Sequence, residues 1–322
     1  MLWVRRSPQP LYTPAMLIWN VFTQVCLPIL VLMSFGWLLD RRFRLDIGSL
    51  VKLNIYLFVP AFIFVQIVSS PLRVGMALRV MAFTLCIIAG MFALSALAAR
   101  IGGYSAAERR SLQLATMFYN SGNYGIPLMT LAFPGSGPVL QVFVILTQNI
   151  STFTIGLLLA VSTHHSGWRR LVPMLRQVSI WAVGAAVLVR WLHIPVEQWT
   201  WLWVPLQYLA AGLVAVALVT LGAQLSQTKH DAGHRARLGW ALGLRLAAGP
   251  LLALLLVPVF GFRGESAAVM ILSSAFPTAV NTALLAHEFR ADANFAAAVV
   301  FYSTLGSMFT VTALVAALRL WG

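Results

Sequence analysis

Long apolar runs dominate the sequence and limit its fold more than any other feature. A helix needs about 20 mostly apolar residues to cross a bilayer, and ten runs of about that length follow one another with short charged, Gly- or Pro-containing segments between them. Because the backbone polar groups inside a bilayer must be paired within the span, these runs predict an all-α polytopic membrane protein. The predicted spans are residues 16–39, 47–69, 75–99, 111–133, 138–163, 174–192, 203–226, 238–260, 266–289 and 294–320.

The spans fall into two sets of five, so we expect one membrane domain made of two repeats, residues 1–163 and 164–322. The loops on one side of the predicted spans hold 15 of the 22 Lys and Arg residues, and the segments on the other side hold 7. Since cytoplasmic loops retain positive charge, we expect both termini outside the cell membrane, whether inner or plasma membrane. Because five is odd, the second repeat is inverted relative to the first.

Composition narrows the partners and the function classes. Only 9% of the residues are charged, against about a quarter in soluble domains, and the net charge is +14. The Lys and Arg residues stand in clusters between apolar runs, which favours membrane lipid over nucleic acid as a partner. The loop histidines lie among basic residues and Cys26 and Cys86 lie in apolar runs, so we assign no metal and no cofactor. No predicted span carries a nucleophile and base pair, and we expect no enzyme activity.

Two predicted spans, the fourth and the ninth, are interrupted by residues that favour unwound backbone. The fourth break lies ten residues beyond Arg110, or about 15 Å deep in a core roughly 30 Å thick. Matched interruptions in two halves point to the substrate site of a transporter, although an ordinary Pro kink is the alternative for each. The candidate substrate-binding residues are Asn120, Ser121, Gly122, Asn123, Gly125, Pro127, Pro277, Thr278 and Asn281.

The half-helix that follows each break favours an anion. Its unpaired N–H groups present roughly half a positive charge near the midplane, which suits a carboxylate without any Lys or Arg nearby. Asn123 or Ser121 is expected to cap the outer half of the fourth span, and Thr278 or Asn281 the inner half of the ninth. The predicted substrate is a small organic anion.

The two interrupted segments resemble those of the auxin efflux carrier family, which includes plant carriers and bacterial carriers assigned to malate or malonate. The resemblance implies two inverted five-helix repeats, with the fourth and ninth helices crossing and an elevator-like or rocking motion. It also implies a homodimer. Plant members have a long hydrophilic loop between the halves, whereas residues 164–173 form a short one here. The matching stretches are residues 120–128 and 277–281, then 292–295 with 303–305, and more weakly 54–60 and 221–223.

The sequence therefore predicts a secondary transporter for small organic anions, auxin-like or malate- and malonate-like, that works by alternating access at a midplane crossover. A sodium-coupled organic-anion symporter of the bile-acid type has the same broken-helix plan and is the alternative. Arg245 has two interpretations: it holds a second carboxylate of a dicarboxylic acid, or it reaches back to the headgroups, which we favour. Gln148 in the fifth span is expected to lie outside the site.

Overall fold

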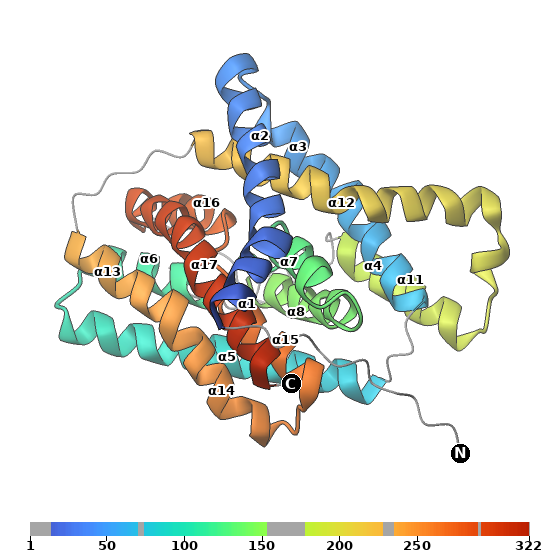
Figure 1. Ribbon diagram of the computed structural model, residues 1–322. Helices are drawn as coiled ribbons and strands as arrows, with labels where there is room; N and C mark the ends of the chain where they lie inside the picture. Colours follow the sequence, from blue (N-terminus) through green and yellow to red (C-terminus); the bar gives the residue numbers. More distant parts are fainter. Residues whose placement is uncertain (1–13, 70–73, 153–177, 228–234, 289–290, 322) are drawn as a thin grey trace, which may run out of the picture.

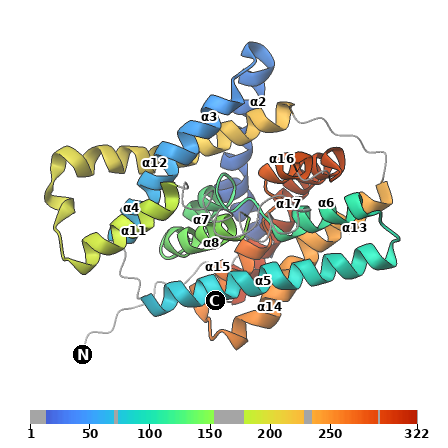
Figure 2. The same ribbon diagram turned by 180° about the vertical axis from the view of Figure 1, so that it is seen from behind.

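The computed structural model describes residues 14–69, 74–152, 178–227, 235–288 and 291–321. These ranges are helical and contain no β-strand, apart from an isolated antiparallel bridge between Tyr119 and Thr278 (Figures 1 and 2). In the first half the helices are α1 (Pro14–Val21), η1 (Phe22–Cys26), α2 (Leu27–Phe43), α3 (Ile47–Leu53), η2 (Asn54–Phe58), α4 (Val59–Val68), α5 (Val74–Ile101), α6 (Ala106–Met117), α7 (Gly125–Ala132) and α8 (Gly137–Ser151). In the second half they are α11 (Val178–Trp191), η5 (Val196–Gln198), α12 (Thr200–Gln227), α13 (Arg235–Gly243), η6 (Leu244–Ala248), α14 (Gly249–Val259), α15 (Gly264–Ser274), α16 (Asn281–Glu288) and α17 (Ala293–Trp321).

Six helical segments of the described ranges are long and apolar enough to cross a membrane. They fall on the first, second, third, seventh, eighth and tenth predicted spans, which confirms a helical membrane protein. The shorter apolar helices α8 and α11 lie on the fifth and sixth, where residues 153–177 are outside the described chain. The six segments are Ile18–Phe43, Ile47–Val68, Val74–Ile101, Thr200–Gln227, Ala236–Val259 and Ala293–Arg319.

Three of these spans contain a π-helical turn, and each turn ends two residues before a proline, at Pro28, Pro60 and Pro250. Proline lacks the N–H that an α-helix uses, and its ring crowds the preceding turn. A locally wider turn accommodates that defect, and such turns are frequent at functional sites. Two of the three turns carry a buried polar residue, Asn54 in η2 and Arg245 in η6.

Glycine sets the closest helix packing, between α2 and α12. A Cβ atom at Gly36 would lie 2.0 Å from the carbonyl oxygen of Val219, and one at Gly222 would lie 1.8 Å from that of Met33. Small residues of this kind allow two membrane helices to approach backbone to backbone. The pair fixes the C-terminal part of α12 against the first span, and Gln224 in the same part of α12 lines the candidate site.

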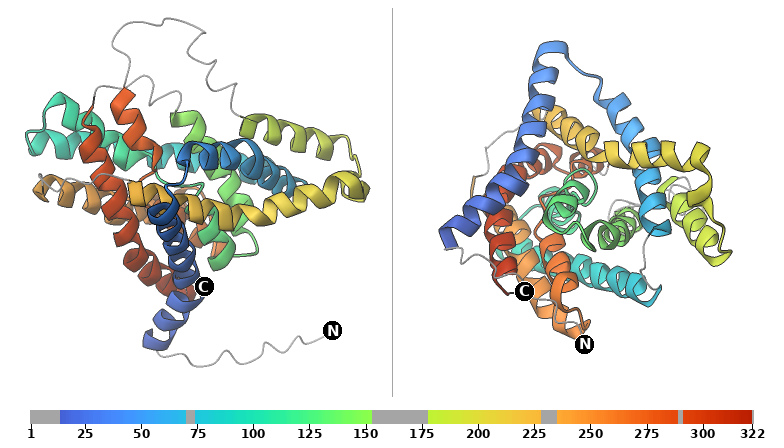
Figure 3. Two further views of the ribbon diagram at one scale, coloured as in Figure 1. Left: turned by 90° about the horizontal axis from the view of Figure 1, so that it is seen from above. Right: turned by 45° about the vertical axis from the view of Figure 1, so that its right-hand side comes forward.

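Both predicted interruptions are present as breaks in the helices. α6 ends at Met117 and α7 begins at Gly125, while α15 ends at Ser274 and α16 begins at Asn281. In the right-hand view of Figure 3, α7 and α8 (green) lie at the centre with the longer helices around them. The two breaks are therefore held inside the bundle, where unwound backbone is tolerated only if it meets protein or lines a cavity.

Candidate functional site

The two broken segments contact each other through their backbones. The N–H of Asn120 donates to the carbonyl oxygen of Pro277 at 2.8 Å, and the N–H of Ala279 donates to that of Phe118 at 3.1 Å. These bonds pair backbone groups that the interrupted helices leave without partners. The breaks from the two halves of the chain thus form one joint structure.

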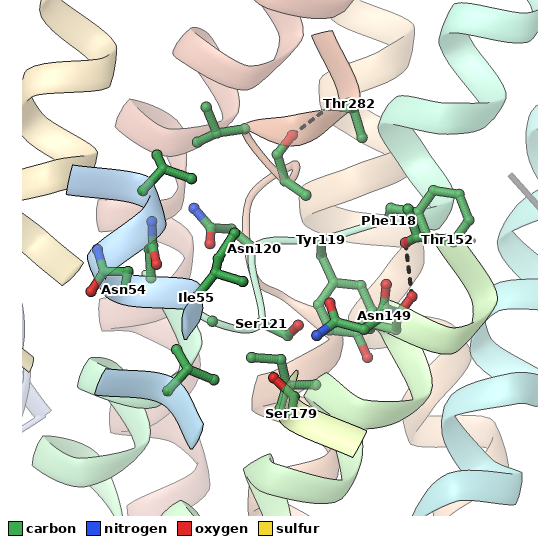
Figure 4. Close-up of a pocket in the computed structure, with 18 of the residues that line it drawn as sticks. Asn54, Ile55, Phe118, Tyr119, Asn120, Ser121, Asn149, Thr152, Ser179 and Thr282 are labelled. Carbon is green, nitrogen blue, oxygen red and sulfur yellow. Dashed lines mark hydrogen bonds between the residues drawn. The ribbon is translucent and has the colours of Figure 1, made fainter. Parts of the chain in front are cut away.

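A cavity with a volume of about 190 Å³ lies at this joint (Figure 4). Six amide side chains line it, and no Asp, Glu, Lys, Arg or His is among the described residues that do. An amide presents both a donor and an acceptor, so the wall suits a polar ligand of either charge. The lining residues are Val51, Asn54, Ile55, Val59, Phe118, Tyr119, Asn120, Ser121, Gly122, Asn123, Ile145, Gln148, Asn149, Thr152, Ser179, Gln224, Ala279, Val280, Thr282 and Leu285.

The first break supplies most of the predicted site residues. All four positions from Asn120 to Asn123 line the cavity, and Gly125 and Pro127 lie buried in α7 just beyond it. Asn120 is oriented for binding: it is 7% exposed, and its Nδ2 atom has no hydrogen-bond partner in the described chain. An unpaired buried donor of this kind favours a ligand that supplies an acceptor.

The second break contributes two apolar residues to the cavity wall rather than the predicted Pro277 and Thr278. Pro277 and Thr278 do not line the cavity, and Thr278 is fully buried with its hydroxyl donating to the Ala115 carbonyl oxygen at 2.7 Å. Ala279 and Val280 line the cavity in their place. Asn281 begins α16, and its side chain lies outside the described part of the structure.

The predicted cap of the fourth span was wrong, and of the two candidates for the ninth span Thr278 is excluded. Tyr124 precedes α7 without a side-chain cap, so neither Asn123 nor Ser121 plays that part. Asn120 comes closest, because its Oδ1 atom accepts from the Tyr124 N–H at 3.3 Å. Thr278 cannot cap α16, since its hydroxyl is turned to α6. Caps depend on backbone direction, and within an unwound segment the sequence does not fix that direction.

The cavity is bordered by helix ends that lie on one side of the bundle. Thr152 follows the end of α8, Ser179 is near the start of α11, and Gln224 is near the end of α12. A hydrogen bond of 2.6 Å from Gln227 to Asp40 joins that end of α12 to the end of α2. Figure 4 shows Asn54, Ser121, Asn149 and Ser179 around the same space.

Packed side chains close the opposite side. Gln141 of α8 donates to the Ser121 carbonyl oxygen at 2.8 Å and accepts from the Ser273 hydroxyl at 3.0 Å. The Phe276 ring lies edge-on between Tyr119 and Tyr124, with centroid distances of 6.2 and 5.7 Å. All of these side chains are buried, so the structure is closed on this side of the joint.

Arg245 lies behind the cavity, and our preference for a side chain at the headgroups was wrong. It is fully buried and is not among the lining residues, so it does not contact the cavity either. Its guanidinium donates to the carbonyl oxygens of Thr116, at 2.6 Å, and Ser274. It also stacks over the ring of Tyr119, with Cζ 4.9 Å from the ring centroid.

Gln148 was misplaced as well. It lines the cavity near the Tyr119 hydroxyl, and neither of its amide atoms makes a well-formed hydrogen bond to a described residue. Asn54, Asn149 and Gln224 are further wall residues that the sequence did not single out as part of the site. The sequence feature that could have identified them is an amide side chain inside an apolar span. Burying such a group in the membrane costs free energy unless it has a hydrogen-bond partner or lines a cavity.

Two comparisons with known proteins give matches that cover most or much of the chain. A family model described as "Membrane transport protein" matches residues 138–315. An uncharacterized transporter of Methanothermobacter thermautotrophicus is 26% identical over 293 residues, which cover 89% of this chain and 95% of that protein. The match to the family spans α8 to most of α17 and includes the second break.

Proposed function

The chain belongs to the membrane transport protein family, that of the auxin efflux carriers, and we propose that it is a secondary transporter for small organic anions. The proposal rests mainly on the joint of the two broken helices, where an amide-lined cavity without charged wall residues lies at the start of two half-helices. Helix N-termini bind anions through free N–H groups and a positive dipole end. The site therefore offers positive potential without a wall cation that would hold the substrate too tightly to release.

The size of the cavity points to a small acid. Its volume of about 190 Å³ is below the roughly 300–1,000 Å³ typical of pockets for drug-sized ligands. Asn120 and Asn123 from the first break and Gln148 from α8 supply amide donors for carboxylate oxygens. We propose a carboxylate of the malate or malonate class, with an auxin-like acid as the larger option.

We propose alternating access between two inverted repeats, residues 1–163 and 164–322. The paired breaks support such a repeat, because each half contributes one broken helix to the joint. The closed layer of Gln141, Phe276 and Tyr124 on one side supports a state that opens on the other. With the Lys- and Arg-rich loops inside, the termini lie outside the cell membrane and this state faces inward. We also propose a homodimer, as the family resemblance implies.

A thermal-shift experiment with purified full-length protein tests the substrate class. Malonate, L-malate and indole-3-acetate are each added as the choline salt, with choline chloride as the reference, because a bound ligand stabilises the folded state. At least one acid should raise the unfolding temperature, and its uptake into proteoliposomes should saturate. If none of the three binds or is transported, the organic-anion proposal is wrong.

A variant pair locates the site. Asn123→Ala should lower the affinity for the bound acid about tenfold to a hundredfold, because it removes a hydrogen bond to a charged group. Thr130→Ala is the matched control, since Thr130 lies in α7 and donates to the Ile126 carbonyl oxygen rather than lining the cavity. Equal affinities in the two variants would place the site elsewhere.

A further inference from the structure

We propose that the guanidinium of Arg245 occupies the position in which a coupling cation would be held at the joint, so that this carrier works without sodium. The inference rests on the proposed transport function. It concerns the two helix ends opposite those assigned to the anion: α6, which ends at Met117, and α15, which ends at Ser274.

The contacts of Arg245 are those of a cation site. Discontinuous membrane helices hold Na⁺ or H⁺ with their C-terminal ends and unwound carbonyl oxygens. Arg245 is bonded to one such carbonyl on each half-helix, Thr116 in the last turn of α6 and Ser274 at the end of α15. A single fixed charge thus joins the negative ends of both broken helices.

The balance of helix dipoles explains why the joint needs this charge. A helix end carries roughly half an elementary charge, negative at the C-terminus and positive at the N-terminus. The ends of α6 and α15 and the starts of α7 and α16 meet here, so the four together come to about zero. The charge of Arg245 offsets the two negative ends, which leaves about one positive charge for an anion. In a sodium-coupled carrier the ion supplies that charge.

The surroundings hold the guanidinium in place. Tyr119 contacts both the guanidinium and the cavity, because its ring lies against the guanidinium and the residue is part of the cavity wall. On the far side, a Cβ atom at Gly249 would lie 2.5 Å from the Ser274 carbonyl oxygen and 2.7 Å from Nη2 of Arg245. The glycine therefore keeps open the space that the guanidinium fills.

The first measurement uses the wild-type protein without any organic anion. Its unfolding temperature is recorded in NaCl and in N-methyl-D-glucamine chloride at equal ionic strength. We expect the same value in both, because the cation position is already filled. A rise that is specific to millimolar sodium would overturn the proposal.

The second measurement uses a variant that lacks the Arg245 guanidinium. In Arg245→Met, millimolar Na⁺ or guanidinium should raise the unfolding temperature on the order of 2 °C relative to N-methyl-D-glucamine. Arg190→Met is the matched control, since Arg190 also donates to a carbonyl near a helix end, that of Ile67 at 3.0 Å, but away from the joint. A monodisperse Arg245→Met protein that responds to neither cation, or a control that responds equally, would contradict the proposal.

Arg245→Lys tests the proposal if the methionine variant does not fold, because lysine keeps a positive charge near the two carbonyl oxygens. It should fold and show no sodium response, whereas a sodium response in this variant would show that a fixed side-chain charge does not fill the position. These readouts need no substrate. Failure of all three acids to bind would therefore refute the anion proposal and leave the cation result standing.

Discussion

Gln141 donates to the carbonyl oxygen of Ser121 at 2.8 Å, which ties α8 to the first helix break. Its own oxygen accepts from the Ser273 hydroxyl, so one side chain connects α8, the break and α15. Gln148 stands two turns later in α8 and lines the cavity, but its buried amide atoms make no well-formed hydrogen bond to a described residue. The same residue type thus has a structural part at one position and is available to a ligand at the other.

This contrast gives a matched prediction for Gln141→Leu and Gln148→Leu. The first change should lower the unfolding temperature, because it leaves buried partners unpaired at about 1–3 kcal/mol each. The second should leave the unfolding temperature unchanged or raise it, and should weaken binding of the acid about tenfold. Thermal unfolding and ligand titration of both variants check this, and a larger loss of stability in Gln148→Leu would contradict it.

Gly125→Ala should destabilise the closed side of the joint. A Cβ atom there would lie 2.5 Å from the Phe276 ring and 2.7 Å from Nε2 of Gln141, and overpacking of a buried site costs about 1–3 kcal/mol. Gly122→Ala is the control, because its nearest neighbour is the flexible end of Ile145 at 3.1 Å. The unfolding temperature of Gly125→Ala should be well below that of Gly122→Ala. The reverse order would show that the packing around Gly125 is not tight.

The helix breaks were predictable because their cause is local. Gly and Pro clustered within a helix destabilise it, and depth follows from counting residues at about 1.5 Å each. The caps were not predictable for the complementary reason. Which oxygen reaches which N–H depends on the path of the unwound chain, and the contact between Asn120 and Pro277 sets that path.

Depth is predictable from sequence, but the direction in which a side chain points is less so. Arg245 lies eight residues beyond Arg237, about 12 Å along a helix, which places it deep in the eighth predicted span. Both interpretations nevertheless gave it a partner that it does not have in the structure. Its acceptors are backbone carbonyl oxygens, and every residue type has one of those. Gln148 was misplaced for a similar reason, since α8 is buried on nearly all sides and a polar residue on it can face either a neighbouring helix or the cavity.

Two further glycine variants test the scaffold rather than the site. Gly36→Ala and Gly222→Ala should each prevent the close approach of α2 and α12, because the obstructing atoms at 2.0 and 1.8 Å are backbone carbonyl oxygens that cannot rotate away. Gly243→Ala is the control. No atom lies within 4 Å of its Cβ position, and alanine is favoured over glycine in a helix by about 1 kcal/mol.

Size-exclusion profiles and thermal unfolding of the three glycine variants check this second prediction about packing. Gly36→Ala and Gly222→Ala should lose monodisperse protein, and Gly243→Ala should match or exceed the wild type. A stable Gly222→Ala protein would mean that α2 and α12 are farther apart than the structure places them.

The orientation in the membrane is tested by two single cysteines, Ala106→Cys and Gly135→Cys, in a background with Cys26 and Cys86 replaced by Ala. Ala106 begins α6 and Gly135 follows α7, both are exposed, and the chain between them passes through the first break. Without Arg245, which is buried at the joint, 14 Lys and Arg residues lie on the side of the loop before α6 and 7 on the other, so this loop is expected inside. In intact cells, a membrane-impermeant thiol reagent should therefore label Gly135→Cys, and it should label Ala106→Cys only after permeabilisation. The opposite pattern would reverse the orientation, whereas equal labelling in intact cells would mean that the broken helix does not cross the membrane and would remove the basis for inverted repeats.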